Sequence, residues 1–304
     1  MQRLVGFPLR TCVISLCATL LATGCASTSF APARTFAAET VKLSATFPPM
    51  LAGTHDSCMG NAMRKQIVLN RSPNPGDSER AAMDTCAPIR MTNPQAAAIN
   101  DIVLAYARSV SAAADGDLKS FSQEGKGLNE ALDSLQRPGS DTPVFDKGKL
   151  SLVVKLGQYL ASQMTQGLQK ATLRDLLAKQ DEVNAATDLL KEYAQRTYRA
   201  SLVAEARDLA TLRTYVANTA RTEPLAANYI DTRLYMEGKQ LAERQKLADE
   251  YYVRAIDGMQ ASLGSLRANI DRLKDPALKQ QLEQYQEQVA ALERQSAFYA
   301  PVRW

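Results

Sequence analysis

The sequence predicts an all-α protein, an elongated antiparallel helical bundle with a long coiled-coil-like hairpin. Two observations support this fold class. Apolar residues recur at steps of three and four along most of the chain after residue 93, which is the period of an amphipathic helix. Residues 171–220 contain neither glycine nor proline, so nothing in that stretch interrupts a long helix. We find no candidate strand of note.

The first 24 residues have the composition of a secretory signal peptide. Arg3 and Arg10 supply positive charge, residues 12–23 are uncharged, and small residues precede the boundary. The uncharged run of about 12 residues is shorter than the roughly 20 that a membrane-spanning helix needs. We therefore expect an exported chain from which residues 1–24 are removed.

The four residues Ala22-Thr23-Gly24-Cys25 resemble the lipobox of bacterial lipoproteins, with Ala22 where the family usually has leucine. The resemblance implies that the Cys25 thiol is lipidated, becomes the new N-terminus and carries three acyl chains such as palmitate. Two lipid signals already anchor a protein stably. Ala26, rather than an aspartate, follows the cysteine. By analogy with enterobacterial lipoproteins, this indicates the outer membrane, with the protein facing the periplasm. The alternative is an ordinary signal peptide cleaved nearby, with Cys25 incidental.

The remaining cysteines predict one disulfide. Two of the five cysteines leave with the signal peptide and Cys25 would carry lipid, so Cys58 and Cys86 remain as a pair in an oxidising compartment. A bridge between them closes a loop of about 28 residues and would stabilise the fold by roughly 3–4 kcal/mol. The alternatives are two free thiols or a metal site. A metal site lacks ligands, because His55 and the two cysteines leave a fourth position unfilled.

Two segments precede the main bundle. Residues 25–49 are mostly small and polar, and we expect a flexible tether there after the lipidated cysteine. Residues 50–92 contain both remaining cysteines and a turn-forming stretch rich in proline and glycine. They predict a small helical segment, with helices at about 57–69 and 78–86 joined by the disulfide.

The helical bundle is expected over residues 93–304. Asn93 resembles an N-cap and Pro94 a first helical residue, so we expect a helix to begin there. Another helix, from about residue 150, is apolar on more than one side, which indicates a central position. Gly157 lies on its buried stripe and would allow a neighbour to approach closely.

The long hairpin is expected over about 171–273, followed by a last helix over about 275–298. In its first helix, apolar residues recur every seven positions in two sets: Leu176, Val183 and Leu190, then Leu202, Leu209 and Val216. The step between the two sets is twelve residues, so we expect the apolar seam to shift sideways there. A turn at 222–224 makes the second helix antiparallel to the first. Asp275 is a plausible cap for the last helix.

No catalytic set is recognisable. One histidine excludes most zinc and general-base arrangements, and the sequence has no phosphate-binding loop or nucleophile motif. We therefore expect no enzymatic activity, no cofactor and no metal. Once Arg3 and Arg10 are removed, 34 basic residues stand against 32 acidic ones, a net charge of +2 that gives no basis for nucleic-acid binding.

The sequence favours a non-catalytic helical scaffold or partner-binding lipoprotein, acting with another envelope protein. Four residues near position 300 are candidate partner-binding residues, because aromatic and arginine side chains are common interface anchors: Phe298, Tyr299, Arg303 and Trp304. This tail could equally fold back over the end of its own bundle. The hairpin tip near 219–226 is a second candidate surface.

Two further functions stay open. The main alternative is a helical-bundle carrier of an apolar small ligand in the periplasm, with the helix at 150–168 lining its pocket. A hairpin that inserts into membranes is less favoured, because no apolar segment of about 18 residues follows the signal peptide.

Overall fold

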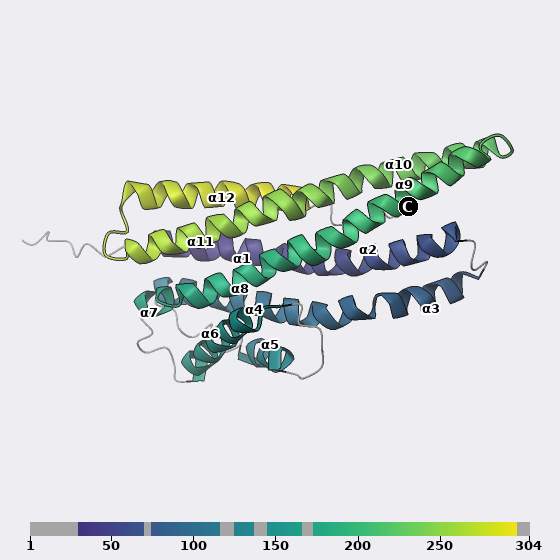
Figure 1. Cartoon of the computed structure of the whole chain (residues 1–304). Helices are drawn as coiled ribbons and strands as arrows, with labels where there is room; N and C mark the ends of the chain where they lie inside the picture. The colour runs from purple at the N-terminus through teal and green to yellow at the C-terminus, as the bar shows by residue number, and fades with distance from the viewer. Residues whose placement is uncertain (1–29, 70–73, 116–124, 137–144, 166–172, 297–304) are drawn as a thin grey trace, which may run out of the picture.

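The computed structural model of the chain describes residues 30–69, 74–115, 125–136, 145–165 and 173–296 (Figure 1). Within these ranges the regular structure is helical throughout, without a β-strand, which confirms the predicted all-α class. None of the described helices combines the length and the apolar character needed to span a bilayer.

The first half of the chain contains α1 (Ala31–Ala45), α2 (Phe47–Val68), α3 (Pro75–Thr85), α4 (Ala87–Asp115), α5 (Gly125–Gln136) and α6 (Lys147–Thr165). The second half contains α7 (Leu173–Leu177), α8 (Gln180–Glu192), α9 (Arg199–Thr219), α10 (Pro224–Lys246), α11 (Tyr252–Ala268) and α12 (Pro276–Ser296). Two π-helical segments join long helices: η2 (Tyr193–Tyr198) between α8 and α9, and η3 (Leu247–Tyr251) between α10 and α11.

The helices form an elongated bundle from which one pair projects (Figure 1). α1, α4, α8, α11 and α12 pack on one another in the bundle, with α5 and α6 against α4. α9 and α10 pack antiparallel on each other and extend beyond it, and we call this pair the hairpin. α2 packs along α9, and α3 packs back on α2. One apolar core continues from Phe36 in α1 to Val216 and Leu234 in the hairpin.

The expected tether over residues 25–49 is wrong from Ala31 onward, because this stretch forms α1 and the start of α2. Phe36 is fully buried, and its ring centroid lies 6.1 Å from that of Tyr285 in α12. Some of the small residues that resembled a linker are also buried; Ala33 and Ala37, for example, pack in the same core. Small side chains let α1 approach its neighbours closely, so the same composition serves a core helix.

The disulfide-joined helices predicted for residues 50–92 are present, although α2 begins at Phe47, well before its expected start. α3 is capped by Asn74, whose side-chain oxygen accepts a hydrogen bond from the Gly76 backbone N–H at 3.0 Å. Pro75 occupies the first helical position, where its missing N–H costs nothing.

The predicted helix start at Asn93 is wrong, since α4 begins at Ala87 and contains Pro94 in its interior. Asn93 has a different role from capping. Its side-chain nitrogen donates to the Leu51 carbonyl at 3.0 Å, and its side-chain oxygen accepts from the Tyr193 hydroxyl at 2.6 Å. Asn93 therefore links α4 to α2 and to η2 from within a continuous helix.

The twelve-residue step from Leu190 to Leu202 coincides with η2. Three α-helical turns take about 11 residues, so twelve residues exceed them by about one. A π-helical turn accommodates one extra residue. Leu190, Tyr193, Tyr198 and Leu202 are accordingly all buried, and the seam continues into α9 without the predicted sideways shift.

The first helix of the predicted hairpin, expected from about residue 171, is divided by a turn at 178–179 into α7 and α8, and its second helix ends at Ala268 rather than near 273. The last helix follows the predicted pattern closely. Asp275 caps α12 by accepting a hydrogen bond from the Ala277 backbone N–H at 2.8 Å, with Pro276 at the first position. The apolar seam of α12 is buried as expected: Leu278, Leu282, Tyr285, Val289 and Leu292.

Replacing Phe36 with alanine tests whether α1 belongs to the core. We expect Phe36→Ala to lower the free energy of unfolding by about 3–5 kcal/mol, as for a buried aromatic residue. Tyr215→Ala, at an exposed position of α9, should change it by less than about 0.5 kcal/mol. Urea denaturation followed by circular dichroism measures both. A Phe36 effect as small as that of Tyr215 would mean that α1 is not packed.

Candidate functional site

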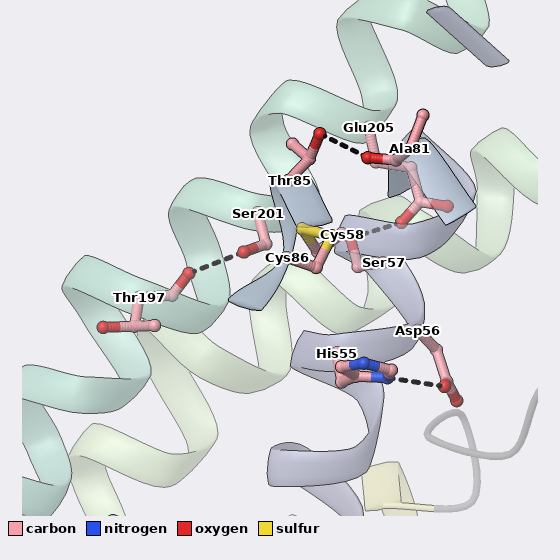
Figure 2. Close-up of a disulfide and its surroundings, with 10 residues drawn as sticks. All are labelled: His55, Asp56, Ser57, Cys58, Ala81, Thr85, Cys86, Thr197, Ser201 and Glu205. Atoms are coloured by element: carbon pink, nitrogen blue, oxygen red, sulfur yellow. Dashed lines mark hydrogen bonds and ion pairs between the residues drawn. A yellow bond between two sulfur atoms is a disulfide. The ribbon is translucent and has the colours of Figure 1, made fainter. Parts of the chain in front are cut away.

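The disulfide between Cys58 and Cys86 is present, as predicted, and it joins α2 to the end of α3. The Cα atoms lie 6.0 Å apart. Cys86 packs with Ala62 and Ala82 in a small apolar cluster of its own. Figure 2 shows the disulfide beside the start of α9, where Ser57 and Glu205 meet. The bridge thus holds α3 and α4 to the part of α2 that contacts the base of the hairpin.

A polar pocket of about 230 Å³ lies where α2, α9 and α10 meet. Its residues are charged or polar with few exceptions: Asp56, Ser57, Gly60, Arg64, Glu205, Arg233, Glu237, Gln240, Leu241 and Arg244. We call this set the polar pocket. Arginines and carboxylates occur in it in equal number, so the pocket has no strong net charge.

Glu205 is the central residue of the polar pocket and is only 5% exposed. Its carboxylate accepts a hydrogen bond from the Ser57 hydroxyl at 2.6 Å and a second from the Arg64 guanidinium. Arg64 also donates to Glu237 of α10 at 2.7 Å. One side chain of α2 therefore binds both helices of the hairpin through charge-assisted hydrogen bonds. Because Glu205 is already paired twice, the arrangement joins helices and leaves no unpaired carboxylate on that residue.

Tyr198, in η2, lies next to this cluster. Burial raises the pKa of its hydroxyl above the usual range, and the nearby Arg244 guanidinium acts in the opposite direction. The Tyr198 ring approaches Gly53 of α2 so closely that a Cβ there would lie 3.3 Å from it. Glycine at this position therefore lets α2 pack on the π-helical turn.

Away from the polar pocket, α9 and α10 line two adjoining open cavities of about 640 and 410 Å³. Ala210 and Arg213 line both of them. We call the joined hollow the hairpin groove. Its lining contains many small residues from α9 and α10: Ala206, Ala210, Ala217, Ala220, Ala227, Gly238 and Ala242. The groove and the polar pocket share no residue.

One ion pair crosses the hairpin groove. Arg213 of α9 donates to the two carboxylate oxygens of Asp231 in α10 at 2.8 and 3.3 Å. The guanidinium holds the pKa of the Asp231 carboxyl below its usual value. The Arg213 guanidinium also lies 5.8 Å from the Tyr235 ring, which borders the groove and is partly exposed. The groove therefore combines a floor of small apolar residues with a polar crossing point.

The predicted site residues near the two ends of the chain lie outside the described residues. These are Cys25, the proposed lipid site, and Phe298, Tyr299, Arg303 and Trp304, the candidate partner-binding set. Their predicted roles stay predictions.

His55, the one histidine, lies on α2 close to Asp56, with Nδ1 at 3.9 Å from a carboxylate oxygen (Figure 2). The side chain is half-buried. Across the described ranges, no group of three or more histidine, cysteine, aspartate or glutamate side chains is arranged to hold a metal ion.

Ser57, Arg64 and Glu205 were not among the residues predicted from the sequence. One signal was available, because Glu205 lies three residues after Leu202 and four before Leu209, on the apolar seam itself. A carboxylate at a seam position must be paired when the seam is buried. Its partners could not be read from the sequence, since Arg64 lies 141 residues earlier in the chain.

No protein-family model, no curated protein and no solved structure matches this chain.

A double-mutant cycle tests the coupling in the polar pocket. Glu205→Leu leaves the part-buried Arg64 guanidinium with one of its two carboxylate partners, Glu237, and we expect a loss of up to about 3 kcal/mol in the free energy of unfolding. Arg64→Met combined with Glu205→Leu should recover most of this loss, because both charges are then gone. Urea denaturation of the two single variants, Arg64→Met and Glu205→Leu, and of the double variant measures the coupling. Strictly additive losses would show that the two residues do not act as a pair.

Proposed function

We propose that this protein is a non-catalytic partner-binding lipoprotein, anchored by lipid on Cys25 at the periplasmic face of a bacterial outer membrane. In this proposal the hairpin presents its groove to a helical segment of an envelope protein. The hairpin groove is the observation that carries the proposal, because a long, open hollow lined by small residues suits a third helix.

The position of α1 gives the hairpin an orientation under this proposal. Only residues 26–30 separate Cys25 from Ala31, and five residues span at most about 18 Å. α1 lies in the part of the bundle away from the hairpin tip, and the chain runs from it into α2 toward the hairpin (Figure 1). A lipid on Cys25 would therefore hold that part of the bundle near the membrane and direct the tip away from it.

The length of the continuous helix determines how far from the anchored end of the bundle the hairpin groove lies. α8, η2 and α9 together comprise 40 residues from Gln180 to Thr219. At 1.5 Å per residue they extend about 60 Å. A partner that binds in the groove would then contact the protein several tens of ångströms from the anchored end of the bundle.

The chemistry of the groove defines the partner. Alanines and a glycine on the floor permit close approach of a helix backbone, and Leu209 and Leu234 supply apolar contact. The Arg213–Asp231 pair places one positive and one negative side chain next to each other in the groove. We therefore propose an amphipathic helix with an apolar stripe and polar residues that meet this ion pair.

The carrier function receives less support from the residues that were expected to line its pocket. A Cβ on Gly157 of α6 would lie 2.6 Å from the Leu132 side chain and 3.2 Å from that of Ile102. Neighbouring side chains from α5 and α4 thus already fill the space beside this glycine, where a bound ligand had been expected.

In-cell photo-crosslinking tests the proposed function. A benzoylphenylalanine at Thr214, an exposed residue of the groove, should capture one envelope protein through a peptide with amphipathic helical periodicity. Ala210→Arg fills the groove and should reduce this capture at least ten-fold. Ala200→Arg, at an exposed position of α9 outside the groove, should leave it unchanged.

Equal capture by both arginine variants, or no captured protein, would contradict binding in the groove. Far-ultraviolet circular dichroism of the purified variants shows whether they keep their helical content, so that a loss of capture is not a loss of fold.

A further inference from the structure

The outer face of α10 carries an apolar stripe that no described helix covers. Leu225, Tyr229 and Met236 are 85%, 66% and 44% exposed, and they follow one another at steps of four and seven residues. They therefore share one helix face, together with Thr232. We call these four residues the outer stripe. It points away from the buried residues through which α10 packs on α9: Ala227, Leu234 and Leu241.

The outer stripe lies in line with α12. α12 packs on α11, where a Cβ on Gly258 would overlap the Gln288 side chain, and where the Ser262 hydroxyl contacts the Gln281 carbonyl at 3.5 Å. Tyr251, the last residue of η3, borders a small hollow with Gln288 and Ala291 of α12. These contacts define one face of the α10–α11 helix.

The same face can be followed toward the hairpin tip. A step of five residues across the π-helical turn leads from Tyr251 to Lys246. Steps of three and four then lead through Glu243 and Lys239 to Met236 and on to the rest of the outer stripe. Figure 1 shows α12 beside α11, ending near the point where α11 passes into α10. The end of α12 is thus directed along the outer stripe.

The residues after α12 have the length to cover this stripe. Eight residues, 297–304, follow Ser296, and an extended chain of eight spans about 26–29 Å. This equals the rise of about 17–19 helical residues. Lys246 lies beside the end of α12. A segment that starts there and runs about 17 helical residues back along α10 ends beside Tyr229.

The composition of this segment matches the stripe. Four of its eight residues are large and apolar or aromatic: Phe298, Tyr299, Val302 and Trp304. Pro301 favours an extended backbone in the segment. A segment attached next to its site acts at an effective concentration in the millimolar range, which a second chain or a partner in solution rarely reaches.

We propose that residues 297–304 bind in cis along the outer stripe of α10, with Trp304 close to Tyr229 and the other aromatic residues nearer Met236. The outer stripe and the hairpin groove have no residue in common. This contact therefore stands independently of the proposed function.

Trp304 is the only tryptophan of the chain, so its fluorescence reports this contact directly. In the full chain purified in detergent, we expect a blue-shifted emission maximum and weak quenching by acrylamide. Met236→Lys should shift the emission to the red and raise the quenching constant at least three-fold. Met91→Lys is the matched control, since Met91 is an exposed methionine on the α4 surface, and it should change neither value.

Three outcomes would overturn the proposal. The first is an emission maximum and an acrylamide quenching constant of Trp304, in the unaltered chain, that equal those of free tryptophan. The second is a protected Trp304 that Met236→Lys does not affect, because the segment would then bind elsewhere. The third is protection that disappears on dilution, because the stripe would then be covered by a second copy. Helical content measured on the same samples shows that both lysine variants are folded.

Discussion

The π-helical turn at Tyr193–Tyr198 is the constraint on which the second half of the molecule depends. The helix that begins with α8 must present one apolar face to the bundle and, further along, an apolar face to α10. Its two sets of seam residues are out of phase by about one residue for a regular α-helix. The π-helical turn accommodates that residue, so that Leu190 and Leu202 are both buried, with exposed fractions of 1% and 0%. The hairpin can then project from the bundle as a continuation of the same core.

The same turn also fixes α2. Tyr193 packs edge-on against Phe47, with ring centroids 5.5 Å apart, and donates to Asn93 of α4. Tyr198 packs on Gly53 one turn and a half further along α2. Beyond these tyrosines, Arg64 pairs with Glu205 and Glu237. α2 is thus held first by aromatic packing and then by charge at the base of the hairpin. α2 therefore joins the base of the hairpin to the bundle through both kinds of contact.

The parts of this fold that depend on local periodicity could be predicted from the sequence. The parts that depend on contacts between residues distant in the chain could not. The α12 cap follows from neighbouring residues, and the disulfide follows from the cysteine count, since Cys58 and Cys86 lie 28 residues apart. α1 was mistaken for a tether, because alanines and polar residues reveal a core helix only once Tyr285 is placed beside Phe36. Pro94 was mistaken for a helix start, since nothing local shows that Asn93 binds α2 and η2. The polar pocket was missed for the same reason, although Glu205 on the seam was a visible sign.

A pair of single-residue deletions tests the central claim, that η2 holds one extra residue which keeps the two seams in register. Deleting Gln195, an exposed residue of η2, should turn the segment into regular α-helix with Leu190 and Leu202 still on one face. The free energy of unfolding should then stay within about 1 kcal/mol of the unaltered chain, inside the range of tolerated changes. Deleting Arg207, an exposed residue of α9, should lower it by more than about 3 kcal/mol, because Leu209 and Val216 would rotate out of the core. Urea denaturation of both variants gives the answer, and equal losses from the two deletions would contradict the account.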